Sequence, residues 1–157
     1  MTLLPRRDAA AWPRLLLWAP PVLLWLLVFN RLRVDWSVNP QYSYGWIVPL
    51  LGALVLWRRW KARPPARPPA GLRVPGTILL AGVLAGWLPL ELVLESNPEW
   101  RFALWLAAGL AAGGSLGMLL LAGGRPWLRH FAFPIGFLLI AVPWPTGLEN
   151  AVIQGLM

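Results

Sequence analysis

The sequence predicts an all-α protein, a polytopic transmembrane helical bundle with about five spans in this chain. Of its 157 residues, 58% are hydrophobic and only 13% are charged, and the mean hydropathy is +0.59. A soluble domain carries about 25% charged residues. The net charge of +8 does not indicate nucleic-acid binding, because the basic residues lie between apolar stretches and not on one soluble face. Membrane lipid is the expected partner for most of the surface.

Five apolar stretches approach the length of about 20 residues that a helix needs to cross a bilayer. The first follows Arg6 and Arg7 and lacks a cleavage pattern, so we interpret it as a retained signal anchor. The second and fifth are short and contain proline, which predicts kinked or re-entrant helices. The expected spans, in a single membrane domain over residues 1–157, are about 11–29, 40–57, 74–90, 102–122 and 131–145.

The positive charges alternate between successive predicted loops. Eleven of the 14 Lys and Arg precede or open the first span, lie in the loop 58–73, or separate the fourth and fifth spans. The other three fall in the remaining loops, together with five of the six acids. Cytoplasmic loops carry the excess of Lys and Arg. We therefore expect a multi-pass protein of the bacterial inner membrane with a cytoplasmic N-terminus.

The predicted cytoplasmic loop 58–73 is basic and rich in proline, which favours an extended polyproline II conformation. It could be a ligand for an aromatic groove on a partner. The interpretation we favour is a stiff loop that meets anionic lipid headgroups, as polybasic loops do by default.

Glycines recur at helical spacing in the third and fourth spans, where they would let helix backbones approach closely. Internal packing of the bundle and a homodimer seam are both compatible with this pattern. The glycines are Gly82, Gly86, Gly109, Gly113 and Gly117.

Few residues could carry chemistry. The chain has no cysteine and one histidine, so we assign no catalytic residue and expect no metal and no cofactor. Glu91, Glu95 and Glu99 lie together in an outer loop, where carboxylates could do acid–base work, hold a cation, or simply be solvated. Glu149 and Asn150 are a polar pair in an apolar setting, and an ionisable residue at membrane depth is a functional candidate.

Two segments carry a resemblance to a known family. The first is Tyr42-Ser43-Tyr44-Gly45-Trp46-Ile47-Val48-Pro49, followed by Leu56-Trp57-Arg58-Arg59. The second is Phe133-Pro134-Ile135-Gly136-Phe137-Leu138, followed by Val142-Pro143-Trp144-Pro145 and Leu148-Glu149-Asn150. In their order and separation they resemble the early and middle motifs of the exosortase/archaeosortase family, over roughly residues 15–157. Tyr44 stands where that family usually has histidine.

The resemblance implies a polytopic inner-membrane cysteine transpeptidase or protease. Such enzymes process proteins with a C-terminal sorting signal of the Pro-Glu-Pro type, in pathways linked to exopolysaccharide and surface display. The family's cysteine and its arginine partners lie beyond the second motif, so this chain is expected to be an N-terminal part that is inactive alone, with a C-terminal half or a partner supplying them. Substrate contacts are expected at Tyr42, Ser43, Tyr44, Glu149 and Asn150.

A function of another class also fits the residues. A membrane scaffold, or a non-enzymatic subunit of a polysaccharide export or transport system, would have the same apolar spans and would need no thiol. A downstream reading frame that encodes a further span with cysteine would favour the enzyme.

The charge pattern makes a prediction about topology. Reporter fusions after Arg67 and after Glu95 should report opposite sides of the membrane, with Arg67 cytoplasmic, because eleven basic residues fall on one predicted side and three on the other. Signals from the same side at both positions would contradict the five-span arrangement.

Overall fold

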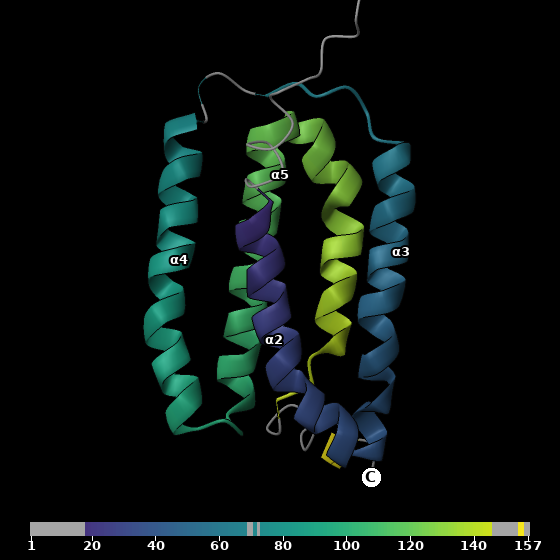
Figure 1. Ribbon diagram of the computed structural model, residues 1–157, viewed down its shortest axis with the longest axis vertical. Coiled ribbons are helices and arrows are strands. Elements are labelled where there is room, and N and C mark those ends of the chain that lie inside the picture. Colours follow the sequence, from purple (N-terminus) through teal and green to yellow (C-terminus); the bar gives the residue numbers. More distant parts are fainter. Residues whose placement is uncertain (1–17, 69–70, 72, 146–153, 156–157) are drawn as a thin grey trace, which may run out of the picture.

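The computed structural model describes residues 18–68, 71, 73–145 and 154–155, and within them it is helical with no strand, as predicted. Four α-helices and two 3-10 helices form one antiparallel bundle (Figure 1). In chain order they are α2 (Ala19–Val38), η1 (Pro40–Trp46), α3 (Ile47–Lys61), α4 (Arg73–Ser96), α5 (Arg101–Leu138) and η3 (Leu139–Ala141).

The helix ends follow from local sequence. Proline in the first turn of α2 fits there, because that turn's N–H groups have no partner inside the helix. Asn39 then leaves the helical conformation, and its side chain accepts a hydrogen bond from the Gln41 backbone N–H at 3.1 Å. This bond ends α2 and begins η1. At the end of α3, three basic residues lie in the last turn, where their positive charge stabilises the negative end of the helix dipole.

The long helix α5 is two arms that run in opposite directions. Gly124 has φ 75° and ψ −166°, a conformation that only glycine adopts readily, and it separates residues 101–123 from residues 125–138 (Figure 1). A Cβ atom at Gly124 would lie 2.1 Å from the carbonyl oxygen of Arg67. Two hydrogen bonds hold the loop 62–68 against this reversal. The Arg67 backbone N–H donates to the Gly123 carbonyl at 3.0 Å, and the Trp127 indole donates to the Pro64 carbonyl at 2.8 Å.

The first arm of α5 is the centre of the bundle. Its buried face is made of small residues, including Ala103, Ala107 and Ala111, so neighbouring helices can approach closely. Helices α2, α3 and α4 all pack on α5 (Figure 1). Inside, the Trp25 indole donates to the Ser115 hydroxyl at 3.1 Å, which in turn donates to the Ala111 carbonyl at 2.7 Å.

The expected number of membrane spans is not confirmed. In the described residues two helices are long and apolar enough to cross a membrane, Thr77–Ser96 and Arg101–Ala141. The second, of 41 residues, contains the reversal at Gly124 and so is not one straight crossing. Helix α2 extends to Val38, past the predicted end at 29, and its last turns carry charged residues. Residues 11–17 of the first predicted span lie outside the described residues.

Two other boundaries differ from the predicted spans. The stretch 40–57 begins as the 3-10 helix η1 and becomes α-helical at Ile47. The stretch 131–145 leaves the α-helix after Leu138 and is extended by Val142, because prolines at 143 and 145 cannot continue it.

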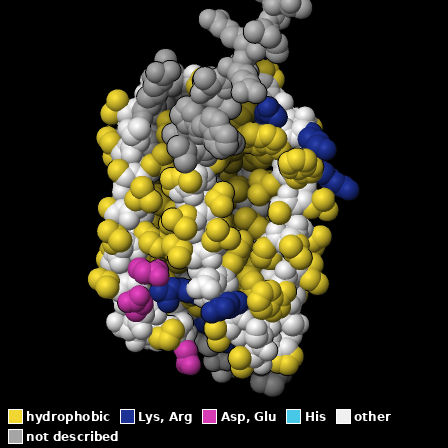
Figure 2. Space-filling view, viewed as in Figure 1, with side chains coloured by type: hydrophobic (Ala, Val, Ile, Leu, Met, Phe, Trp, Pro, Cys, Tyr) yellow, Lys and Arg dark blue, Asp and Glu magenta, His cyan; other side chains and the backbone are white. Residues whose placement is uncertain are grey.

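The molecule is polarised by charge. The loop 62–68, the C-terminal turn of α3 and the reversal at Gly124 form one end, here called the basic end (Figure 1). The opposite end, here called the motif end, holds η1, the segment 139–145 and the α4–α5 loop. Figure 2 shows acidic side chains at the motif end and apolar side chains over the middle of the bundle.

The reversal yields a stability prediction. Gly124→Ala should lower the free energy of unfolding by about 1–3 kcal/mol, because alanine is strained at this φ/ψ and its methyl group meets the Arg67 carbonyl. Gly109→Ala is the control, since a Cβ there has nothing within 4 Å and alanine favours helix. Thermal unfolding in mild detergent measures both. A Gly124→Ala protein as stable as Gly109→Ala would contradict the described reversal.

Candidate functional site

The first motif lies at the motif end, in η1. Gly45 of this motif packs directly under the Trp36 indole, where a Cβ atom would lie 2.2 Å from the ring nitrogen. Trp46 contacts the same indole edge-on, with ring centroids 5.4 Å apart. Glycine at position 45 is therefore a packing requirement, since any side chain would push η1 away from α2.

The second motif ends in an unwound segment beside η1. Its carbonyl groups have lost their helical partners, and side chains replace them. The Trp36 indole donates to the Ala141 carbonyl at 2.9 Å, and the Trp105 indole donates to the Pro143 carbonyl at 2.8 Å. A third carbonyl, that of Trp144, accepts from Nη1 of Arg101 at 3.1 Å. Side chains from α2 and α5 thus fix the path of this proline-rich segment.

Arg101 joins the two motifs. Its guanidinium carbon lies 5.3 Å from the centroid of the Tyr42 ring, and its Nη1 lies 3.3 Å from the Tyr42 hydroxyl. The same nitrogen bonds the Trp144 carbonyl. One cation therefore contacts an aromatic residue of the first motif and the backbone of the second.

The predicted substrate-contact residues occupy different environments. Tyr42 is buried, at 4% exposure, whereas Ser43 and Tyr44 are exposed. The Ser43 hydroxyl donates to the Pro40 carbonyl at 2.9 Å. Glu149 and Asn150 lie outside the described residues. Of the three that the structure describes, Tyr44 therefore presents an exposed phenol at the motif end, and Tyr42 does not.

The three outer carboxylates occupy different environments. Glu91 forms an ion pair with Arg31 of α2, and Arg31 also bonds the Leu94 carbonyl at 3.5 Å. Glu95 and Glu99 are exposed. The Glu91–Arg31 contact ties α4 to α2, which is a structural role for one of the three acids.

Asp35, on the last turns of α2 and beyond the first predicted span, also lies at the motif end. Burial raises the pKa of this carboxyl; Arg101 acts in the opposite direction and Glu99 adds to the increase. The influence of Arg101 and Glu99 places Asp35 in the same electrostatic environment as the joined motifs.

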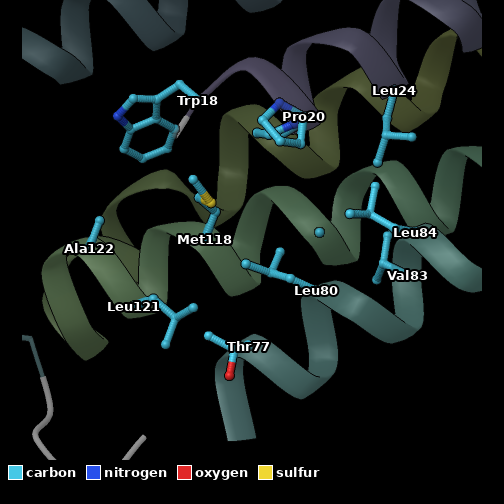
Figure 3. Close-up of a pocket in the computed structure, with 12 residues that line it drawn as sticks. Trp18, Pro20, Leu24, Thr77, Leu80, Val83, Leu84, Met118, Leu121 and Ala122 are labelled. Carbon is cyan, nitrogen blue, oxygen red and sulfur yellow. The ribbon is translucent and has the colours of Figure 1, made fainter. Parts of the chain in front are cut away.

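Elsewhere the bundle is apolar. A cavity of about 380 Å³ lies between α2, α4 and the first arm of α5, with Trp18, Leu80 and Met118 among its walls (Figure 3). Thr77 is the polar residue in this wall, and its hydroxyl donates to the Val74 carbonyl at 2.8 Å. The cavity offers an apolar surface and no reactive group.

No metal-binding group of three or more acidic or histidine side chains occurs in the parts of the chain with described positions. His130 lies at the basic end, where its Nε2 is 2.9 Å from the Arg59 carbonyl oxygen and Arg59 in turn bonds the His130 carbonyl. It is therefore far along the bundle from the motif end.

Sequence reasoning missed the residues that hold the site together. Arg101 appears in the sequence as one charge in an acidic loop, and Trp36 and Trp105 are two of twelve tryptophans. The available signal was the proline-rich segment itself, because its freed carbonyls require donors and only long polar side chains can reach them. The sequence does not show which side chains do so.

The indole bond to the unwound segment can be tested. Trp36→Phe should cost about 1–3 kcal/mol of stability, since it keeps an aromatic ring but leaves the Ala141 carbonyl without this donor. Trp100→Phe, at an exposed tryptophan of the same end, is the matched control and should change stability little. Thermal unfolding in detergent compares them. Equal stability of the two variants would show that the Trp36 bond contributes nothing.

Comparison with known proteins gives one finding. The model of the family described as transmembrane exosortase matches residues 36–157, which include both motifs, η1, α3, α4 and α5. Searches of curated proteins and of solved structures found no match. The matched region covers most of the chain, so this membrane protein belongs to the transmembrane exosortase family.

Proposed function

We propose that this chain is the substrate-facing, N-terminal portion of a membrane cysteine transpeptidase or protease. Its substrates would be proteins with a C-terminal sorting signal of the Pro-Glu-Pro type, and the pathway would serve exopolysaccharide production and surface display. The cysteine nucleophile and its arginine partners would come from a C-terminal half or a partner. The chain alone would be inactive, because it contains no thiol.

One observation carries the proposal: Arg101 brings the two family motifs together at one end of the bundle. A cation, a buried tyrosine ring and a fixed proline-rich backbone there form a rigid frame. The exposed Tyr44 lies on η1 within that frame. An extended signal peptide could bind along such a surface, with Tyr44 and Ser43 as direct contacts and Tyr42 as a support beneath them. Glu149 and Asn150 are proposed as further substrate contacts.

The proposed location is the bacterial inner membrane, with the N-terminus and the basic end cytoplasmic and the motif end outside. The polarity of the bundle supports this orientation, since basic loops are retained on the cytoplasmic side. Five crossings would then be made by α2 with the residues before it, α3 with η1, α4, and the two arms of α5.

A scaffold, or a subunit of a polysaccharide export or transport system, is the second candidate. The absence of cysteine from all 157 residues favours it. The two candidates differ in whether a cysteine-bearing segment converts the chain into an active enzyme.

The activity test uses co-expression with a tagged substrate that ends in a Pro-Glu-Pro-type signal, a transmembrane helix and a basic tail. The chain alone should leave the substrate size unchanged. The chain joined to, or co-expressed with, a family C-terminal half should shorten it, and replacing the half's cysteine by alanine should abolish the change. Processing by the 157-residue chain alone would refute the inactivity. Normal abundance and folding of the combined protein without processing would favour the scaffold.

The role of Arg101 can be measured in that active form. Arg101→Gln should lower processing roughly tenfold or more, because it removes the cation from the Tyr42 ring and weakens the hold on the Trp144 backbone. Arg33→Gln is the matched control, an exposed arginine of α2 towards the same end. Equal activity of the two variants at equal protein levels would remove Arg101 from the proposal.

A further inference from the structure

A second apolar groove lies on the other side of α2 from the cavity of Figure 3. It has a volume of about 520 Å³, which is within the range of small-molecule sites, and it runs between α2, α3 and the two arms of α5. Ala53 and Trp60 both line it, and seven residues of helix separate them, or roughly 10 Å along the axis. The groove therefore extends from the basic end toward the middle of the bundle.

The walls of this groove suit a hydrocarbon chain. The side chains that line it are apolar except for Ser115 and the indole nitrogens, and Ser115 is already bonded to Trp25 and Ala111. A polar occupant would find few partners along such walls, and burying unpaired polar groups is unfavourable. An acyl chain parallel to the helices has no polar group that such walls would leave unpaired.

Two cations contact tryptophan rings that line the groove. Trp57 and Trp60 line the groove near the basic end. The Lys61 ammonium lies 5.0 Å from the centroid of the Trp57 ring, and the Arg63 guanidinium lies 4.8 Å from that of Trp60. Both basic residues are exposed. Cation–π contacts of this kind restrain long side chains that would otherwise be free to move away.

The positive charge at this end is not balanced by nearby acids in sequence. No Asp or Glu occurs between Asp35 and Glu91, which includes all of α3 and the basic loop. Among the residues with described positions, the ion pair that forms is Arg31–Glu91, between α2 and α4. An anion at the Lys61 and Arg63 side chains would therefore meet complementary charge.

We propose that this groove binds one anionic phospholipid. One acyl chain lies along Trp25, Leu56, Phe131 and Ile135, and the headgroup phosphate is held by Lys61 and Arg63. The site requires only that the protein be in a membrane, so it is independent of the proposed enzymatic function. It would anchor α3 to α2 on the face where no other protein segment is described.

Native mass spectrometry of the whole chain from detergent tests the proposal. With equal amounts of phosphatidylglycerol and phosphatidylcholine, the protein should retain one phosphatidylglycerol preferentially. Lys61→Gln with Arg63→Gln should weaken this retention roughly tenfold to 30-fold, as expected for two basic residues near a lipid headgroup. The matched control, Arg125→Gln with Arg129→Gln, removes the same charge elsewhere at the basic end and should have less than about a twofold effect.

A second variant tests the groove itself. Ala53→Phe should fill the part of the groove nearer the middle of the bundle and so reduce retention of both lipids. Circular dichroism should show unchanged helix content. Equal loss of binding in the two charge-removal variants would mean diffuse surface attraction and would overturn the proposal. So would displacement of the lipid by inorganic phosphate, or retention unaffected by Ala53→Phe. A dimer that Ala53→Phe dissociates, with no lipid retained, would place a second copy in the groove and likewise overturn it.

Discussion

The motif end depends on one constraint: every backbone carbonyl that leaves a helix near a membrane needs a donor from the protein. The hydrocarbon core of a bilayer supplies no hydrogen-bond donor, and each group left unsatisfied there costs several kcal/mol. The prolines after Leu138 break the helix and expose such carbonyls. Two indoles and one guanidinium satisfy three of them. Because those donors come from α2 and α5, satisfying the backbone also fixes the relative positions of the helices.

The same logic explains the close packing around the donors. Trp36 must reach Ala141, so η1 has to pass tightly beneath the indole, and Gly45 permits this. Arg101 donates a hydrogen bond to the Trp144 carbonyl, and in this position its guanidinium lies over the Tyr42 ring. The family motifs are therefore explained in part by structure. Their glycine and first tyrosine are packing residues, whereas Ser43 and Tyr44 between them are exposed.

Much of the architecture could be predicted from the composition and from the pattern of apolar and basic residues along the chain. The all-helical class, the membrane environment and the approximate positions of the helices follow from apolar length and from the placement of arginine. The family follows from the two motifs. The number of crossings is not confirmed, because among the described residues only Thr77–Ser96 and Arg101–Ala141 are long and apolar enough to cross a membrane. The reversal at Gly124 does fall between the predicted fourth and fifth spans. The partners of Arg101 and Arg31 could not be predicted either, since these contacts join residues that lie between 43 and 63 positions apart in the sequence.

The reversal at Gly124 has a consequence for how the chain enters a bilayer. The two arms of α5 are joined without an intervening loop, and the loop 62–68 packs over their junction. No long hydrophilic segment has to cross between the arms, so they can insert together as a helical hairpin, each covering part of the other's surface.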